Sequence, residues 1–352
     1  MPMQPLHRPE RPAATDRQPR RRASIPRSIQ RKGKTMAITR DTELHRWRRL
    51  AVMRDHPELT ALMGPYLPTA GWAVAVVGVQ VCIAAWIGQQ PWWAIAITAY
   101  TVGAVASLSL LSLLHETSHD LVFRRPSANQ WLGIFCGLPL MVPAATSYRK
   151  GHHLHHSHLG DTVYDGDFAS PWEARMVGNC PLRKAMWLVA QPLLLSLRIG
   201  RMPGVVVVDR WSLANVAVQV VFDVAVVVWL GWGAATYLVL AHCFALGLHP
   251  LGGRWIQEHH IVDPGQVTYS YYGPMNRLVF NCGYHSEHHD LMRVPWIHLP
   301  KVRRIASEVY GPLHAHTSWG RLLVRFLFDR ELTLANRTYG CGNKGAARKV
   351  TA

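Results

Sequence analysis

The sequence of 352 residues predicts an all-α integral membrane protein. We expect four transmembrane helices, arranged as two hairpins, and a cytosolic helical cap that holds a histidine-rich metal site. Three observations predict this fold class. Hydrophobic residues make up 49% of the chain and gather in long uncharged runs, Lys and Arg flank those runs on one side, and the 20 histidines include three groups with helical spacing.

The charge balance and the cysteines narrow the partners and the compartment. Lys and Arg number 38 against 21 Asp and Glu, a formal net charge of +17. Such an excess is typical of proteins that bind nucleic acid or an anionic membrane surface. The apolar runs favour the membrane, and without a nucleic-acid-binding motif we expect no nucleic acid partner. The six cysteines form no CxxC pair, which indicates a reducing compartment for the non-membrane part.

Both ends of the chain are predicted to lack regular structure. The first 35 residues hold ten Lys or Arg against two acidic residues, so residues 1–40 are predicted to form a disordered basic tail. This tail lacks the apolar core of a secretory signal, and a start at Met36 remains an alternative. The folded domain is expected over residues 41–335, followed by a flexible tail over residues 336–352.

Four apolar stretches are predicted to cross the membrane. The first two contain no charged residue and are joined by Gln89-Gln90-Pro91, and the second two are joined by Gly231-Trp232-Gly233. Each is close to the ~20 residues that a helix needs to cross ~30 Å of hydrocarbon. Asp223 is an ionisable residue at depth, either functional or facing a neighbouring helix. The predicted spans are residues 72–88, 92–114, about 213–230 and about 234–251.

Shorter amphipathic or apolar segments are predicted outside the spans. Residues 41–67 read as a short amphipathic helix, which either lies at the membrane surface or is a solvated charged helix. Residues 131–147 are apolar but broken by Pro139 and Pro143, so they are expected to be re-entrant or interfacial, as are residues 186–197. In the last hundred residues, amphipathic helices are expected at about 275–290, 299–310 and 317–329.

The distribution of Lys and Arg predicts the topology. The two short connections within the hairpins carry neither residue, whereas the segments on the other side of the spans carry many. The positive-inside rule then places both termini in the cytosol. The cytosolic cap is expected over residues 115–210 and 252–335. The membrane would be the plasma membrane in a bacterium and the endoplasmic reticulum in a eukaryote.

Three histidine groups are the candidate metal ligands. Two of them follow an HxxHH spacing, which puts three imidazoles on one face of a helix, and the third puts two at i and i+4. Neutral imidazole is a common ligand of iron, zinc, copper and nickel. Eight such histidines exceed what one mononuclear site needs, so a multi-metal site is predicted. The candidates are His115, His119, His152, His155, His156, His285, His288 and His289.

Other polar residues near these groups are further candidates. His259 is a candidate ligand that would complete the shell of a second metal, and His249 is a candidate for a hydrogen bond to a ligand. His153 and His158 fall off the face that the HxxHH spacing defines. Glu287 and Asp290 lie within or directly after the last group, and beyond the metal ligands no catalytic residue is predicted.

The motif HETSH also matches HExxH, the zinc-protease signature, in which Glu116 would be the general base. Such a site uses three protein ligands and one zinc, which would leave the two HxxHH groups without a purpose. A metal transporter would need polar residues repeated along several spans, and these spans are apolar. Both remain minor alternatives.

The chemistry of a histidine-rich site favours an oxidising enzyme. Imidazole ligands with few carboxylates hold redox-active iron and leave positions open for O2. A centre of two irons supplies the oxidising equivalents needed to take hydrogen from an unactivated C–H bond. At the place where apolar helices meet the cytosol, a lipid chain can reach it from the bilayer. We therefore favour a membrane oxygenase or desaturase with a di-iron site.

These motifs resemble a known family. HxxxH, HxxHH and HxxHH, placed after transmembrane hairpins or on a soluble helix, resemble the pattern of membrane fatty-acyl desaturases and related hydroxylases. Four segments between about residues 45 and 335 are similar to those of sphingolipid Δ4-desaturases, the dihydroceramide desaturases. The segments are RWRRLAVMRDHPELTALMGP, HPLGGRWIQEH, TYSYYGPMNRLVFNCGYHSEHHD and LPKVRRIASEVY.

The resemblance implies a di-iron enzyme that uses O2 and two electrons to put a trans double bond at C4–C5 of the sphingoid base of dihydroceramide, giving ceramide. Electrons would come from a separate donor, cytochrome b5 or a ferredoxin-type protein. The eight histidines of the three boxes become iron ligands, with His259 as the ninth. Glu116 then supports a ligand and is not a protease base.

Three features depart from the family pattern, one of which is the basic extension of 36 residues at the start of the chain. Arg254 and Trp255 are bulkier and more basic than the family leads us to expect, and DLMRVPW replaces a DFPNIPG-like loop. Related enzymes hydroxylate C4 or act on other acyl lipids, and the boxes do not distinguish these reactions. C4-hydroxylation of a sphingolipid and desaturation of another acyl lipid are therefore kept as alternatives.

Overall fold

The computed structural model describes residues 37–337 except for residues 162, 207 and 264. Residues 1–36 and 338–352 of the predicted tails therefore lie outside the described residues. Residues 37–40 and 336–337, which were predicted to belong to the tails, are instead helical. The described chain is helical, and its strands are the two-residue β1 (Ser270–Tyr271) and β2 (Ala315–His316), which pair in parallel. The expectation of a predominantly helical protein is confirmed.

Three helices are long and apolar enough to cross a membrane. The first is α2 (Pro68–Ile87), and the second runs from Trp92 to Ser118 through α3 (Trp92–Thr98), η3 (Ala99–Gly103) and α4 (Ala104–Ser118). The third runs from Arg210 to Leu230 through α9 (Arg210–Ala225) and η5 (Val226–Leu230). Each of the first three predicted spans has its counterpart.

The fourth predicted span, 234–251, is different. Helix α10 (Trp232–Leu246) ends after 15 residues, and it passes the same length and composition test only together with η6 (Pro250–Gly252) and α11 (Gly253–His259), across a 43° bend. The break precedes Pro250, which has no N–H to donate and keeps His249 extended. The structure thus gives three to five candidate spans, and the arrangement as two hairpins stays a prediction.

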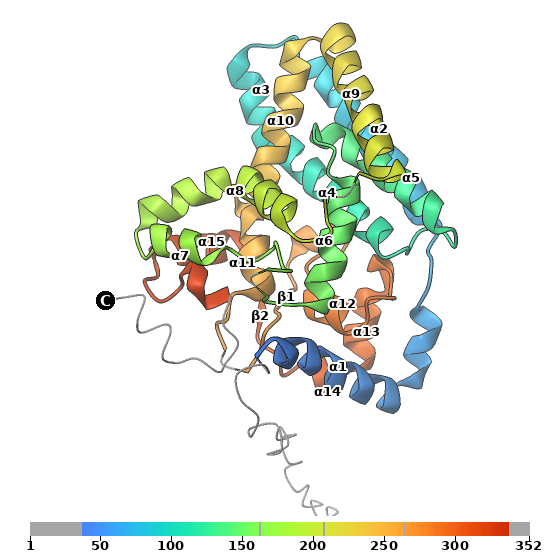
Figure 1. The fold of residues 1–352 in the computed structure, drawn as a ribbon, viewed down its shortest axis with the longest axis vertical. Coiled ribbons are helices and arrows are strands. Elements are labelled where there is room, and N and C mark those ends of the chain that lie inside the picture. The colour runs from blue at the N-terminus through green and yellow to red at the C-terminus, as the bar shows by residue number, and fades with distance from the viewer. Residues whose placement is uncertain (1–36, 162, 207, 264, 338–352) are drawn as a thin grey trace, which may run out of the picture. The chain divides into compact units, whose positions relative to one another are not determined.

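Close backbone contact holds the apolar helices together, at the end of the molecule where Figure 1 shows α2, α3, α9 and α10. A Cβ atom added at Gly233 would lie 2.1 Å from the carbonyl oxygen of Gly88, so the end of α2 and the start of α10 touch through glycine. Deeper in, Tyr237 donates to Gln80 at 3.1 Å, which satisfies two buried polar groups.

Of the two segments predicted to be re-entrant or interfacial, residues 131–147 contain a bend and residues 186–197 lie in an amphipathic helix. Helix α5 (Pro126–Gly137) and η4 (Leu138–Leu140) meet α6 (Ala145–Ser157) at 111°, as expected for the broken segment 131–147. The predicted segment 186–197 lies inside one continuous helix, α8 (Pro181–Arg201). That helix buries Trp187 and Leu188 and exposes an apolar stripe, which fits the interfacial alternative. The stripe consists of Leu182, Met186, Val189, Leu193 and Leu197.

The C-terminal third matches its prediction in part. The helix expected over 275–290 is wrong, because η7 (Pro274–Arg277) and α12 (His285–Asp290) are separated by turns in which Phe280 and Asn281 have positive φ. The second expected helix is split at Ala306, and the third is confirmed. The elements here are η8 (Trp296–His298), α13 (Leu299–Ile305), α14 (Ser307–Tyr310), α15 (Trp319–Phe328) and η9 (Leu334–Arg337).

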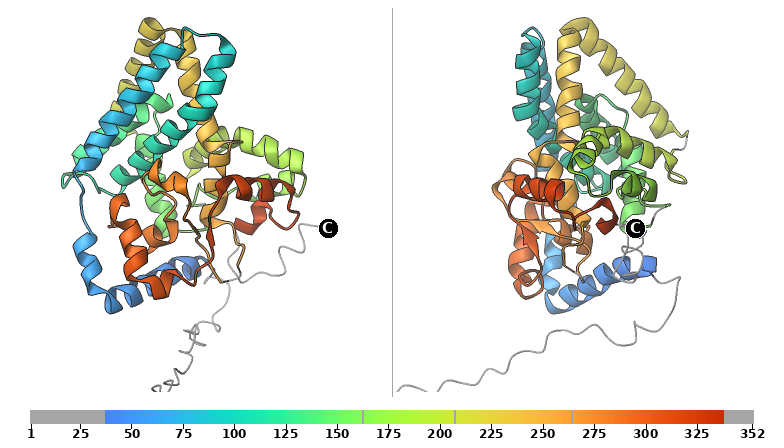
Figure 2. Two further views of the ribbon diagram at one scale, coloured as in Figure 1. Left: turned by 180° about the vertical axis from the view of Figure 1, so that it is seen from behind. Right: turned by 90° about the vertical axis from the view of Figure 1, so that its left-hand side faces the viewer.

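The segment 41–67 forms two helices, of which the first has one face buried and leaves Trp47 and Leu50 exposed on the other. Helix α1 (Ala37–Asp55) and η2 (Pro57–Leu62) lie at the end of the folded unit opposite to α2 and α10 (Figures 1 and 2), and α1 packs against α12. His45 and Val52 are buried on this face. The helix is therefore a support of the histidine-bearing α12.

Candidate metal centre

Four helices bring nine imidazoles together. The HETSH motif lies at the end of α4, GHHLHHSH on α6, His259 at the end of α11, and the last box on α12. Helices α4 and α6 are also in direct contact with each other. The nine residues are the eight histidines of the three boxes and His259, and they divide into two groups in which the candidate ligand atoms lie within 4.8 Å of one another.

The five-histidine group consists of His115, His119, His152, His156 and His288. Its Nε2 atoms lie 3.0 Å apart between His115 and His288, and 2.9 Å apart between His119 and His152. His156 lies 3.0 Å from His152 and 3.1 Å from His288 by the same atoms. Nitrogen ligands bound to one metal at ~2.0–2.1 Å are about 3 Å apart, so this spacing suits a shared ion.

The four-histidine group consists of His155, His259, His285 and His289. The Nε2 atom of His259 lies 3.1 Å from that of His155 and 3.0 Å from that of His285. The Nε2 atom of His289 is buried and has no hydrogen-bond partner in the described part of the chain. A buried nitrogen without a partner is costly, and a metal ion would satisfy it.

The electrostatics of α12 fit metal binding. Burial, followed by repulsion from the neighbouring imidazoles, holds the pKa of His285, His288 and His289 well below the ordinary value of 6.5. These rings are therefore neutral near pH 7 and offer nitrogen lone pairs. Neutral imidazole is the form that binds a metal, so both groups present suitable donors.

Two contacts orient rings of the four-histidine group from behind. The Nδ1 atom of His155 lies 2.9 Å from both carboxylate oxygens of Asp165, and Nδ1 of His259 lies 3.2 Å from the carbonyl oxygen of Val267. Protonation of Nδ1 leaves Nε2 free as a metal donor. Asp165 was not a predicted site residue, although an acidic run, DTVYDGD, follows the second box and could have indicated it.

Asp290 anchors α12 to α1. Its Oδ1 accepts a hydrogen bond of 2.6 Å from Nδ1 of His45, and its Oδ2 accepts one from Nε of Arg48. Burial alone would raise the pKa of the Asp290 carboxyl, but Arg48 and His45 hold it below its ordinary value. The ring of His45 lies 5.0 Å from that of His289. Neither His45 nor Arg48 was a predicted site residue, because no motif links them to the last box.

The other polar candidates lie outside the two groups. One Glu116 oxygen accepts a hydrogen bond of 3.1 Å from the backbone N–H of Trp296, and the other lies 3.8 Å from Nδ1 of His115. Glu287 accepts from the hydroxyls of Ser270 and Tyr272, each at 2.6 Å. These two carboxylates are thus used to hold neighbouring segments.

The remaining histidine candidates serve local structure. His249 accepts a hydrogen bond of 3.1 Å from the N–H of Leu251 at the start of η6, so the predicted bond to a ligand is not what the structure shows. Nε2 of His153 lies 2.6 Å from the carbonyl oxygen of Ser118. His158 lies at the end of α6. Both fall outside the groups, as their position off the HxxHH face predicts.

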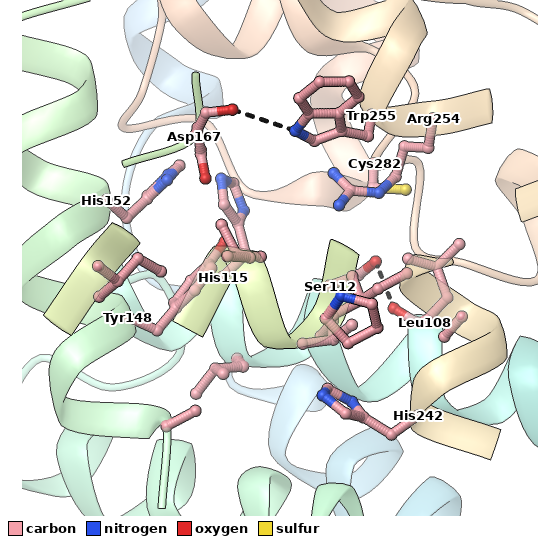
Figure 3. Close-up of a pocket in the computed structure, with 18 of the residues that line it drawn as sticks. Leu108, Ser112, His115, Tyr148, His152, Asp167, His242, Arg254, Trp255 and Cys282 are labelled. Carbon is pink, nitrogen blue, oxygen red and sulfur yellow. Dashed lines mark hydrogen bonds between the residues drawn. The ribbon is translucent and has the colours of Figure 1, made fainter. Parts of the chain in front are cut away.

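An apolar cavity of about 410 Å³ ends at the imidazoles. Its walls include Leu108 and Leu111 of α4, Ile199 of α8 and Leu246 of α10, and its lining also includes His115, His152, His285 and His288. In Figure 3, His115 and His152 lie at one side of this space, and His242 lies at the other. A deep, largely apolar cavity suits a hydrocarbon chain whose reacting carbon lies near the histidines.

Comparisons with known proteins identify relatives of this chain. Residues 91–321 match the family described as "Fatty acid desaturase". The chain is 37% identical over 292 residues to the rice (Oryza sativa subsp. japonica) protein "Sphingolipid delta(4)-desaturase DES1-like", covering 82% of this chain and 87% of the relative. It is 37% identical to the Drosophila melanogaster "Sphingolipid delta(4)-desaturase DES1" and 38% identical to the human "Sphingolipid delta(4)-desaturase/C4-monooxygenase DES2", in each case covering 82% of this chain and 89% of the relative.

Proposed function

Because the chain belongs to the fatty acid desaturase family, we propose that it is a sphingolipid Δ4-desaturase. It would introduce a trans double bond between C4 and C5 of the sphingoid base of dihydroceramide and so form ceramide. One observation carries the proposal: two adjacent groups of imidazoles lie at the end of a cavity with apolar walls, in a chain whose relatives are named for this reaction.

The nine histidines are the proposed ligands of two irons. The five-histidine group would hold one iron and the four-histidine group the other. When bound, the irons supply the oxidation of an unactivated C–H bond by O2. Two hydrogens leave the lipid, and together with two electrons and two protons they reduce one O2 to two waters. The electrons would come from a separate donor, either cytochrome b5 or a ferredoxin-type protein.

The residues around the groups prepare this chemistry. Asp165 holds the ring of His155 in one orientation, and Asp290 ties α12 to α1, so little reorganisation is needed when a metal binds. The leucines of α4 and α10 exclude water from the cavity and align the lipid chain.

C4-hydroxylation is the second candidate function. The bovine and human relatives are named both as Δ4-desaturase and as C4-monooxygenase. Both reactions begin with removal of a hydrogen at the same position of the sphingoid base. Desaturation then removes a second hydrogen from the neighbouring carbon, whereas hydroxylation adds a hydroxyl group. Desaturation of another acyl lipid is a third, weaker candidate. An intramembrane zinc protease is disfavoured, because Glu116 is hydrogen bonded to Trp296 and nine histidines gather where three ligands would suffice.

The placement in the membrane is part of the proposal. The apolar helices make this a membrane protein, and we infer that it crosses the membrane several times with both termini in the cytosol. Domain 41–335 would then present its histidines to the cytosol. The membrane is the plasma membrane or the endoplasmic reticulum, according to the organism.

The test is conversion of dihydroceramide by the purified protein in lipid nanodiscs, supplied with O2 and an electron donor. Mass spectrometry should find ceramide with a trans C4–C5 double bond, and His288→Ala should abolish it. His153→Ala is the matched control, because His153 lies on the same helix as the second box but outside both groups. A 4-hydroxy product alone would favour the second candidate, and no oxidised sphingolipid would refute the proposal.

A further inference from the structure

Arg254 places a positive charge at the wall of the lipid cavity. It lies on α11, the helix that ends in His259, and among the described residues that line the cavity it is the only Arg or Lys. Figure 3 shows its guanidinium beside the cavity, near Cys282 and Trp255. A cation beside apolar walls must be paired or hydrogen bonded, because an unpaired charge there is costly.

The guanidinium is only partly used by the protein. Its Nη1 atom donates to Oε1 of Glu258, one helical turn later, and the described residues provide no other hydrogen-bond acceptor for it. An Arg side chain has five N–H donors, so several remain for a ligand. The Arg254 side chain is 22% exposed, which fits a group that faces the cavity.

Glu258 connects this charge to the candidate metal centre. Its side chain is 9% exposed, and its Oε1 lies 3.7 Å from Nδ1 of His285 in the four-histidine group. In the described chain, no hydrogen-bond donor reaches its Oε2. The indole N–H of Trp255 donates to the carbonyl oxygen of Asp167 at 3.1 Å, which helps to fix the orientation of α11. Arg254 and Glu258 therefore form a fixed polar pair next to the imidazoles.

The chemistry of the proposed substrate demands such a pair. In a sphingoid base, C4 is bonded to the carbon that carries the C3 hydroxyl, and it is two bonds from the carbon that carries the amide nitrogen. The polar head must therefore lie within a few bond lengths of the oxidised carbon. On the same wall, Ser112 donates to the carbonyl oxygen of Leu108 at 2.9 Å. Nε2 of Gln191 and Nδ1 of His242 have no hydrogen-bond partner among the described residues, but neither side chain carries a permanent positive charge as Arg254 does.

We propose that Arg254 and Glu258 bind the polar head of the lipid. The guanidinium donates to the amide carbonyl oxygen, and the free oxygen of Glu258 accepts from a hydroxyl of the sphingoid base. This contact selects an N-acylated amino alcohol over a plain hydrocarbon chain, and it fixes which carbon faces the histidines. The inference rests on the proposed function and extends it to the residues that recognise the substrate.

The experiment measures lipid affinity and product position for Arg254→Leu in nanodiscs. Displacement of labelled dihydroceramide gives the affinity, and an unlabelled alkane of the same chain length, which has no head, is the second competitor. We expect dihydroceramide to bind about 10- to 100-fold more weakly, since hydrogen bonds to charged groups are of that strength. The alkane should compete equally well in both proteins. Residual product should carry double bonds away from C4.

Controls separate this inference from the proposed function and from misfolding. Arg321→Leu removes an exposed arginine of α15 and should change neither affinity nor product position. Iron content equal to that of the wild type shows that Arg254→Leu is folded. If Arg254→Leu does not fold, Arg254→Lys is used instead; it keeps the charge, loses the planar guanidinium and should show an intermediate loss of affinity for dihydroceramide. Wild-type affinity and pure C4–C5 product in these variants would overturn the inference. Failure of the wild type to oxidise dihydroceramide would instead refute the proposed function.

Discussion

His45 and Asp290, 245 residues apart in the chain, are joined by a buried hydrogen bond of 2.6 Å. Arg48 binds the second oxygen of the same carboxylate, so two side chains of α1 hold the residue that directly follows His289. The carboxylate is fully buried and the Arg48 side chain is 11% exposed. The N-terminal helix thereby becomes a support of the candidate metal centre.

Asp290→Asn should therefore destabilise the protein strongly. The change leaves Arg48 buried without its counter-charge, which typically costs about 3–5 kcal/mol. Thermal unfolding in detergent should show a lower midpoint, and iron content should fall because α12 loosens. Asp329→Asn is the control, since its partner Arg325 is 52% exposed and such a pair contributes about 0–1 kcal/mol. Equal effects of the two changes would show that α1 does not hold α12.

Lys184 gives a second stability prediction. This fully buried ammonium donates to three carbonyl oxygens, those of Phe326 and Asp329 at 2.8 Å and that of Leu332 at 2.7 Å. Lys184→Met should leave carbonyls unsatisfied, at about 1–3 kcal/mol each. Hydrogen exchange should then rise between residues 326 and 332. Arg183→Met is the control: it changes an exposed neighbour and should alter the free energy of unfolding by no more than about 0.5 kcal/mol. Unchanged hydrogen-exchange protection of residues 326 to 332 in both variants would contradict this role of Lys184.

The close contact between α2 and α10 predicts that a methyl group added at Gly233 destabilises the protein. Gly233→Ala places a Cβ atom 2.1 Å from the carbonyl oxygen of Gly88, so the helices must separate. Overpacking of this kind costs about 1–3 kcal/mol, measurable as a lower thermal midpoint. Gly78→Ala, where an added Cβ atom meets nothing within 4 Å, should be neutral or slightly stabilising. Tolerance of Gly233→Ala would mean that the two helix ends are further apart.

The pair of His56 and Glu308 predicts a pH dependence. Nε2 of His56 lies 2.5 Å from Glu308, which raises the pKa of His56 above 6.5 and lowers the pKa of Glu308 below 4.5. Because the pKa of His56 is raised, its contribution to stability is present at low pH and is lost as the pH rises through that pKa. Because the pKa of Glu308 is lowered, its contribution is present at higher pH and is lost as the pH falls through that pKa. The pair of His56 and Glu308 therefore stabilises the folded state from below pH 4.5 to above pH 6.5.

Thermal midpoints of wild type and His56→Gln should differ most near pH 5.5, by a small amount because the pair is near the surface. The difference between the two curves should shrink as the pH rises through the raised pKa of His56. A constant difference across this range would show that the ion pair does not form.

The grouping of the histidines could be predicted from the sequence because their spacing within each box is local. Three imidazoles at i, i+3 and i+4 share a face whenever the segment is helical, and α6 and α12 are helical at those positions. Asp165, His45 and Arg48 were missed because they reach the histidines only through the fold. The same holds for Glu258, which no spacing rule connects to His285.

Errors in the predicted helices have local causes that periodicity does not report. Residues 275–290 have an amphipathic pattern, yet the left-handed backbone at Phe280 and Asn281 interrupts them. The fourth span stops at Leu246, because the backbone of Gly247 leaves the helical region, and the chain stays non-helical up to the extended His249 before Pro250. Arg254 stood out in the sequence only as a departure from the family, and its place in the cavity suggests a use for it.

The most direct test of the metal centre is the amount of iron per purified chain, measured in parallel with zinc. The account predicts about two irons in the wild type and in His153→Ala, and a loss of iron in both His119→Ala and His259→Ala, which remove one imidazole from each group. One zinc per chain, or iron content that does not respond to His259→Ala, would contradict it.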